Sequence, residues 1–259
     1  MIEAILVVLS NAREGREDDF NDWYTNVHIR DALRFRGSMA TQRFVLSSGQ
    51  VQDFPEGRFF AKYLALYEVY DAQRFAQEHF DNALTPRMVV TDAFDDTRLD
   101  DYHYYPLQFR DNAPRTDAKG SVVLELFNAA PGQDQALREW YNDSYMPGVM
   151  KRPGVVSGNF LAYDRHGQLM NHKPDHNYVA IYRLSDDAAR ASWKASTALA
   201  ECPHIAAESL AVTCWDIITP RLTEDDVAHT SAAALAREER ARAHIGDNYI
   251  KDRGDKLAG

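Results

Sequence analysis

His28 occupies the position in this sequence that is best suited to proton transfer. It follows Tyr24 by four residues and Phe20 by eight, so on a helix it lies on the same face as both rings. An imidazole titrates near neutral pH; the C-terminal end of a helix dipole would raise its pKa, whereas burial would lower it. His28 is therefore a candidate general base, and capping of the helix carbonyls is the alternative.

Two further candidates could stabilise negative charge. Tyr145 is a phenol that could donate a hydrogen bond to a developing oxyanion, or else a core tyrosine with its hydroxyl at the surface. Arg43 lies in an apolar stretch, where it could hold a carboxylate or phenolate, or else face solvent. Both interpretations stay open for each residue.

Two more candidates lie in predicted strands. Glu125 interrupts the apolar run VVLELF; near aromatic walls its pKa would be raised and it could act as a base, with a salt bridge to Arg43 or a neighbour as the alternative. His103 is followed by Tyr104 in a second strand. Adjacent strand residues point to opposite faces, so only one of these two can face a cavity.

Aromatic side chains would build the walls of such a site. Tyrosines alternate with alanines in two apolar runs, which leaves space between the rings, although core packing is the simpler explanation. A cavity with these walls would favour a small, flat, apolar or aromatic ligand. The predicted substrate-binding residues are Trp23, Tyr24, Tyr63, Tyr67, Trp140, Tyr141, Tyr178 and Tyr182.

The elements that must position these side chains occur twice in the chain. Residues 5–24 (ILVVLSNAREGREDDFNDWY) align without a gap with residues 122–141 (VVLELFNAAPGQDQALREWY). Farther along, residues 62–75 align with residues 177–190 in the same way. Colinear matches of this kind predict an internal duplication.

Each copy has the pattern strand, helix, strand, strand, helix, strand. The predicted strands cover residues 4–9, 40–46, 59–70, 102–109, 122–127, 155–163, 178–184 and 210–218, and the helices cover residues 17–33, 72–84, 134–150 and 186–199. Right-handed crossovers fold each copy as a ferredoxin-like βαββαβ unit. The strands are apolar on both faces, so the two copies should bury their open faces against each other. The predicted fold is α+β: an eight-stranded antiparallel α/β barrel with helices outside and a ligand cavity within.

Four segments follow from this pattern. The first repeat covers residues 1–110, a linker 111–120, the second repeat 121–220 and a helical extension 221–259. Thr223, with Asp226 three residues later, predicts the start of a helix that ends near Gly246. We expect this extension to pack outside the barrel or on a second subunit.

Composition limits the classes of partner. The formal charge of −10 disfavours nucleic acid and anionic lipid. No apolar run approaches the roughly 20 residues of a membrane-spanning helix, and the start lacks a basic leader and a cleavage site, which predicts a cytoplasmic protein. Two isolated cysteines, Cys202 and Cys214, form neither a disulfide framework nor a zinc knuckle.

Metal and cofactor motifs are weak or missing. No glycine-rich nucleotide loop, nucleophile elbow or zincin motif occurs, so we expect no cofactor. His166, His172 and His176 cluster in one segment, but Pro174 breaks the helix that would align the last two, and no metal site is expected. The acidic run of residues 95–101 is expected to be a solvated loop.

One motif resembles a known family. Trp23, Tyr24, His28, Ile29 and Asp31 form the pattern WYxxxHIxD, followed by Gly37 and the strand TQRF of residues 41–44. This arrangement is similar to the EthD-like branch of the dimeric α/β-barrel superfamily. The second copy retains the Trp-Tyr pair and has Tyr145 in place of His28. The resemblance spans both repeats and implies the barrel fold, but the superfamily includes cofactor-free oxygenases, polyketide cyclases, isomerases, dehalogenases and haem enzymes.

Together the residues and the resemblance favour a cofactor-independent lyase or isomerase. It would use general acid/base catalysis on a small aromatic or polyketide-like substrate in the barrel cavity. A cofactor-free monooxygenase and a non-catalytic ligand-binding or accessory barrel are the alternatives. Whether two chains form a homodimer stays open.

Overall fold

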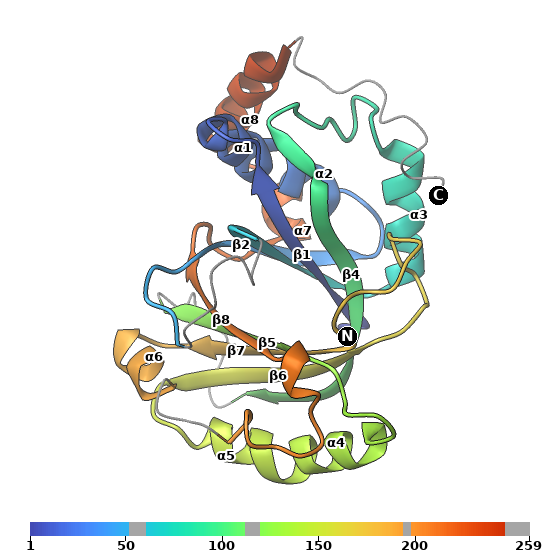
Figure 1. The fold of residues 1–259 in the computed structure, drawn as a ribbon. Coiled ribbons are helices and arrows are strands. Elements are labelled where there is room, and N and C mark those ends of the chain that lie inside the picture. The colour runs from blue at the N-terminus through green and yellow to red at the C-terminus, as the bar shows by residue number, and fades with distance from the viewer. Residues whose placement is uncertain (52–60, 112–119, 194–197, 247–259) are drawn as a thin grey trace.

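The computed structural model describes residues 1–51, 61–111, 120–193 and 198–246. Within them, eight strands close into an antiparallel barrel in the order β3-β1-β4-β6-β7-β5-β8-β2, with β2 returning to β3 (Figure 1). The strands are β1 (Ala4–Ala12), β2 (Ser38–Leu46), β3 (Tyr63–Val69), β4 (Phe94–Asp111), β5 (Ser121–Phe127), β6 (Val155–Tyr163), β7 (Tyr178–Leu184) and β8 (Ala211–Ile217). The predicted α+β barrel is confirmed.

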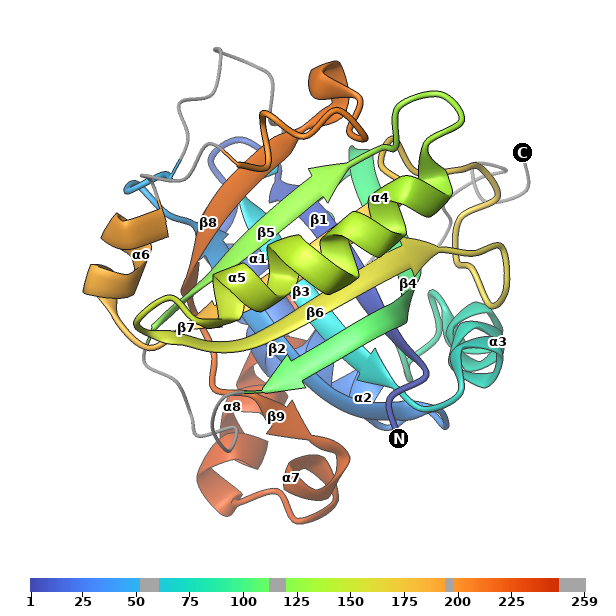
Figure 2. The ribbon, with the colours of Figure 1, turned by 90° about the horizontal axis from the view of Figure 1, so that it is seen from below.

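The barrel joins two halves, which we define as residues 1–111 and 120–220. Each half contributes four neighbouring strands, and the halves meet where β4 pairs with β6 and where β8 pairs with β2. Helices cover the two opposite outer sides: α4 and α5 cross the strands of the second half, as Figure 2 shows, while the helices of the first half lie on the far side. The two halves have the same order of elements.

Side chains alternate between the inside and the outside of the barrel. In β1, Ile5, Val7 and Leu9 pack in the interior, whereas Ala4, Leu6 and Val8 pack outward against the helices. Large side chains from both halves, including Trp215 and Tyr102, occupy the interior. An eight-stranded barrel leaves an interior that side chains readily fill. The candidate cavity described below lies on the outer face of the sheet, between the sheet and the helices, rather than in the barrel interior where it was predicted.

A π-helical turn interrupts the first helix of each half. In the first half α1 (Glu17–Trp23) continues through η1 (Tyr24–His28) into α2 (Ile29–Leu33), and in the second α4 (Asp134–Trp140) continues through η2 (Tyr141–Tyr145) into α5 (Met146–Met150). The outer bounds match the predicted helices, but the prediction had regular helices. A π turn adds a residue to one turn and shifts the phase of the side chains that follow. In the second half Tyr145 is buried and Ser144 is exposed, whereas at the same positions of the first half Val27 is buried and His28 is only partly buried.

Two other helices pack on the barrel, α3 (Ala72–Asn82) and α6 (Asp187–Trp193). The largest departure from the predicted elements is β4, which begins at Phe94 rather than at residue 102. The acidic residues 95–101 therefore lie in a strand that pairs with β1, where Leu9 faces Asp100, and the predicted solvated loop is wrong. Residues 59–60, 112–119 of the predicted linker and 194–197 of the last predicted helix lie outside the described residues.

The extension folds onto its own chain rather than as one helix. A short strand, β9 (Leu222–Thr223), pairs with β2, and a capping box between Thr223 and Asp226 starts α7 (Glu224–Ala228). The chain then turns and α8 (Ala232–Ile245) follows, ending before Gly246 as predicted. Among the described residues, no helix combines the length and apolarity that a membrane crossing requires.

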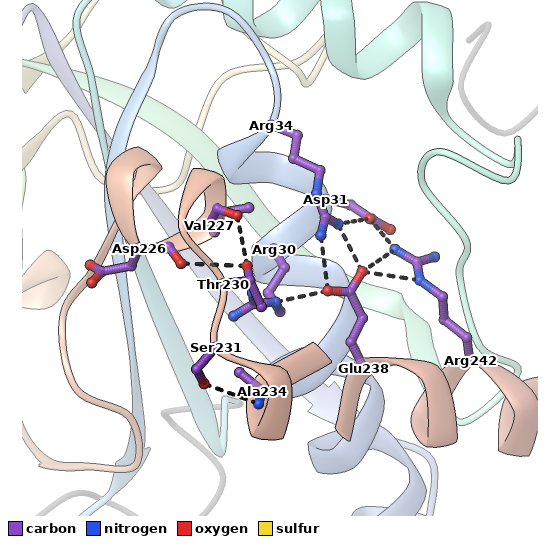
Figure 3. A network of polar contacts seen from close by, with 10 residues as sticks. All are labelled: Arg30, Asp31, Arg34, Asp226, Val227, Thr230, Ser231, Ala234, Glu238 and Arg242. Atoms are coloured by element: carbon purple, nitrogen blue, oxygen red, sulfur yellow. Dashed lines mark hydrogen bonds and ion pairs between the residues drawn. The ribbon is translucent and has the colours of Figure 1, made fainter. Parts of the chain in front are cut away.

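Helix α8 is held against α1, η1 and α2 by a buried ion-pair network (Figure 3). Glu238 is at its centre and accepts hydrogen bonds from Arg30, Arg34 and Arg242. Burial would raise the pKa of Glu238, but these three guanidinium groups outweigh it and hold the pKa at about 2. Arg242 also pairs with Asp31, the last residue of the WYxxxHIxD pattern. The network fixes the helix that carries His28.

Candidate functional site

A cavity lies in the first half between the outer face of the sheet and its helices. Its floor comes from β1, β3 and β4, and its walls come from the α1–η1–α2 helix, from α3 and from the segment before β4. The volume is about 40 Å³, which holds a few water molecules or a small ligand. The lining residues are Leu6, Val8, Trp23, Tyr24, His28, Ala32, Tyr67, Phe75, His79, Met88, Phe94, Leu99 and Asp101.

His28 lines this cavity at the end of the π turn and is partly buried. Its ring packs against two aromatic rings that also contact each other, with 4.7 Å to Trp23 and 4.8 Å to Tyr24 between centroids and the Tyr24 ring nearly perpendicular at 79°. The indole of Trp23 is itself oriented, since it donates a hydrogen bond of 2.8 Å to the carbonyl of Val89. The helix thus presents an imidazole to the cavity in a defined orientation.

Two tyrosine hydroxyls meet at the same cavity. Tyr67 of β3 donates a hydrogen bond of 3.3 Å to the hydroxyl of Tyr24. Burial raises the pKa of Tyr24 to about 12, although the hydrogen bond from Tyr67 and the charge of Arg43 both lower it. Burial likewise raises the pKa of Tyr67. Both phenols are protonated at neutral pH.

Arg43 lies behind Tyr24 and does not line the cavity. Its guanidinium stacks 4.3 Å from the centroid of the Tyr24 ring, and it donates to Asn21 and Thr25. Only 1% of the residue is exposed, so the alternative that it faces solvent is wrong. Burial lowers the pKa of Arg43 to about 10, which still leaves it charged at neutral pH.

Two titratable residues of the cavity were not predicted. Asp101 lies on the outer face of β4 opposite Val8, and His79 comes from α3. The two-residue spacing of Leu99, Asp101 and His103 places all three on one face of a strand, and this spacing could have predicted that Asp101 points toward the helices. It was missed because a run rich in aspartate is more typical of a solvated loop.

His103 points toward the helices but is not a lining residue. Tyr104 faces the barrel interior, in agreement with the strand alternation. The His103 ring packs edge-on against Phe75 with 5.9 Å between centroids. Burial lowers its pKa to about 3, so it is neutral at physiological pH.

The remaining predicted catalytic residues lie in the second half, apart from His28. Glu125 is fully buried and accepts hydrogen bonds of 2.6 Å from Tyr141 and 2.8 Å from Tyr145, and the Tyr141 hydroxyl is 2.7 Å from that of Tyr182. Burial raises the pKa of Glu125 to about 7. The alternative of a salt bridge to Arg43 is wrong, because the guanidinium of Arg43 donates to Asn21 and Thr25 instead.

This second-half cluster occupies the place that corresponds to the cavity. In the alignment Glu125 matches Val8, Tyr145 matches His28, and Phe160 matches Arg43. Phe160 stacks on Tyr141 with 4.0 Å between centroids. Phe160 thus takes the place of Arg43 beside the tyrosine ring, and the Glu125 carboxyl group lies where the first half has the shorter Val8 side chain at the cavity wall.

The predicted aromatic walls divide in the same way. Trp23, Tyr24 and Tyr67 line the cavity, while Tyr63 packs next to Arg43. The second-half group packs in the core around Glu125 and Phe127; its members are Trp140, Tyr141, Tyr178 and Tyr182. The sequence analysis assigned all of these aromatic residues to one site, whereas they form two separate groups, one in each half.

The cavity offers no obvious place for a large cofactor. A volume of about 40 Å³ cannot hold a haem beside His28. Across residues 1–51, 61–111, 120–193 and 198–246, no group of three or more histidine, cysteine, aspartate or glutamate side chains has the geometry of a metal site.

The architecture is that of the ferredoxin-like, dimeric α/β-barrel fold, here closed within one chain. No protein-family model matches the sequence, and no curated protein matches it. Solved structures do resemble it. An anthrone oxidase-like protein aligns with a TM-score of 0.58 at 12% identity over 86% of this chain and 93% of its own.

Two other solved structures are similar. A putative monooxygenase from Fusobacterium nucleatum aligns with a TM-score of 0.57 at 9% identity, covering 86% of this chain and 97% of its own. A mutant chlorite dismutase from Candidatus Nitrospira defluvii aligns with a TM-score of 0.54 at 8% identity, covering 93% and 95%. At such identities the likeness establishes the shared fold and leaves the chemistry to the site itself.

Proposed function

We propose that the first-half cavity is the active site of a cofactor-independent enzyme in which His28 acts as general base. The observation that carries this proposal is the imidazole at the cavity wall, packed against the rings of Trp23 and Tyr24. A base must reach the proton that it removes, and its side chain must be held in place. The reaction is of the lyase or isomerase type: His28 takes a proton from a carbon or hydroxyl of the substrate and returns it at another position.

The cavity wall supports a small, largely apolar substrate. Apolar and aromatic side chains predominate among the lining residues. The volume of about 40 Å³ is smaller than the roughly 150 Å³ of a cavity that binds benzene, so a one-ring substrate requires side chains at the wall to move. The polar groups at the wall are His28, His79, Asp101 and the two tyrosine hydroxyls. This composition fits a one-ring aromatic or enolisable compound, such as a fragment of a polyketide-like molecule.

The test is exchange of substrate hydrogen with solvent deuterium, followed by NMR over a panel of one-ring phenols and cyclic diketones. We expect His28→Ala to reduce exchange by about 100-fold or more while the ligand still binds. His229→Ala, at an exposed histidine of the extension, is the matched control and should leave exchange unchanged. Binding without exchange in the wild-type protein would refute the proposal and favour the non-catalytic barrel.

A cofactor-free oxygenase is the second candidate. Two of the similar solved structures are described as a putative monooxygenase and an anthrone oxidase-like protein. In such a reaction the same base would form a substrate carbanion, which then reduces molecular oxygen. Substrate-dependent oxygen uptake distinguishes this candidate from the isomerase or lyase.

The matching element order and the paired π turns support an origin by internal duplication. We propose that the chain is a tandem member of the EthD-like branch in which the first half keeps the active cavity and the second has filled its own. A homodimer stays a prediction, which the mass of the protein in solution would test.

A further inference from the structure

The charge of Arg43 has no carboxylate counter-ion among the described residues. Its guanidinium is held by the carbonyl and side-chain oxygens of Asn21 and by the hydroxyl of Thr25, all of which are neutral. A buried cation without an anion is unfavourable, and such groups persist where another charge or dipole compensates for them. The groups that favour its charged form are the phenols Tyr24, Tyr67 and Tyr63.

The Tyr24 ring separates this cation from the cavity. The guanidinium contacts one side of the ring, 4.3 Å from the centroid, whereas Tyr24 itself lines the cavity. Tyr67 donates to the Tyr24 oxygen, and among the described residues no group accepts the Tyr24 proton. The proton of Tyr24 is therefore available to a ligand.

The second half provides an internal comparison. Its corresponding tyrosine pair is Tyr141 and Tyr182, and the carboxyl group of Glu125 accepts a hydrogen bond from the Tyr141 hydroxyl. In the first half Val8 stands in place of Glu125, and the cation Arg43 stands in place of Phe160. Next to the tyrosine pair, the half with the cavity thus has the cation Arg43, whereas the second half has no cation in that place but a buried carboxyl group whose pKa is raised to about 7.

We propose that the Tyr24 hydroxyl, with Arg43 behind it, forms an oxyanion site, so that the cavity binds weakly acidic phenols and enols as their anions. This inference rests on the proposed function, because the site would stabilise the anion that remains on the ligand after His28 has removed the proton. Tyr24 donates the hydrogen bond and is the catalytic residue, and Arg43 acts through it as a positioning residue. Deprotonation leaves the pair of electrons on the ligand oxygen while the proton goes to His28.

Other charges face the same space. The charge of Asp101 on β4 raises the pKa of Tyr24 and the charge of Arg43 lowers it, and the effect of Arg43 is the larger of the two. His28 and His79 lie on the helix side of the cavity. An anionic ligand oxygen is favoured next to Tyr24, away from Asp101, whereas a ligand carboxylate at the floor is disfavoured.

The probe is 4-nitrophenol, whose anion absorbs visible light. Titrating the bound probe against pH at saturating protein gives its pKa on the protein without any need for turnover. We expect the wild-type protein to lower that pKa by about one unit, a tenfold preference for the anion. Arg43→Met should abolish the shift, Arg43→Lys should restore part of it, and Tyr24→Phe should reduce it.

The matched control is Arg138→Met, since Arg138 also stacks on a tyrosine, 5.5 Å from the Tyr178 ring, but in the second half. This variant should leave the shift unchanged. Should Arg43→Met fail to fold, Tyr24→Phe decides the question, because it removes a single oxygen. Failure of 4-nitrophenol to bind, an unshifted titration in the wild type, or a shift that survives in folded Arg43→Met or in Tyr24→Phe would overturn the proposal.

The two proposals fail separately. If the anion is preferred but no hydrogen exchange occurs, the oxyanion site stands and the enzymatic function falls. If exchange depends on His28 while the probe binds as the neutral phenol, the function stands and the oxyanion site falls.

Discussion

The buried Glu125 should make the protein less stable as pH rises through neutrality. Its pKa is raised from 4.5 to about 7 because burial disfavours the carboxylate, and the hydrogen bonds from Tyr141 and Tyr145 offset only part of this effect. The folded state therefore binds the proton more tightly than the unfolded state. The resulting stabilisation is complete below pH 4.5 and is lost as pH rises to 7.

The magnitude follows from the shift. A difference of about 2.5 pKa units corresponds to about 3 kcal/mol of free energy of unfolding. Glu125→Gln removes the titration and keeps the size of the side chain. The free energy of unfolding of Glu125→Gln minus that of wild type should rise by about 3 kcal/mol as pH increases from 4 to 8, because only wild type loses stability over this range.

Urea unfolding of both proteins at several pH values measures this difference, because comparison with the variant cancels every other titrating group. Glu139→Gln, at an exposed position on α4, is the control and should follow wild type throughout. Parallel stability curves for wild type and Glu125→Gln would refute the conclusion that the carboxyl group is protonated on folding.

Three further variants test other parts of the structure. Val8→Glu places a carboxyl group where the second half has Glu125 and should fill the cavity; binding of 4-nitrophenol should fall at least tenfold in a protein that still melts cooperatively, and retained affinity would argue against this cavity as the site. Glu238→Gln should cost about 3 kcal/mol in thermal unfolding, because it leaves the buried Arg30 without its ion-pair partner, whereas exposed Glu239→Gln should have little effect. Gly37→Ala should destabilise by more than about 2 kcal/mol, since φ is +98° and a Cβ would lie 2.4 Å from a backbone carbonyl oxygen. Gly15→Ala has a positive φ but open space around it, so an equal loss in both variants would show that the contact is unimportant.

The tertiary arrangement of the candidate residues could be predicted only in part. The helix period correctly grouped Trp23, Tyr24 and His28, because neighbours on one helix face are set by local geometry. The same reasoning could not show that Tyr145 and Glu125 form a separate cluster, since their distance from His28 depends on how the halves close. The π turns have no recognised signature in the sequence, so regular helices were predicted in their place.

Asp101 is the clearest case of a cavity residue whose position the sequence could not predict. A run of aspartates favours solvent by composition, yet pairing of β4 with β1 carries the strand back to Phe94 and brings Asp101 to the cavity floor. Strand pairing between distant segments is a long-range interaction, so it can override a local preference.

Sequence by itself determined the elements and their alternation. The bounds of β6 and β7 were predicted to the residue, and the tyrosines and alanines that alternate along β3, Tyr63, Ala65 and Tyr67, do lie on one face of the strand. Only the tertiary structure decided which face holds the cavity. The reason is volume: the interior receives large side chains from both halves, whereas the outer face of the first half has Val8 where the second half has Glu125.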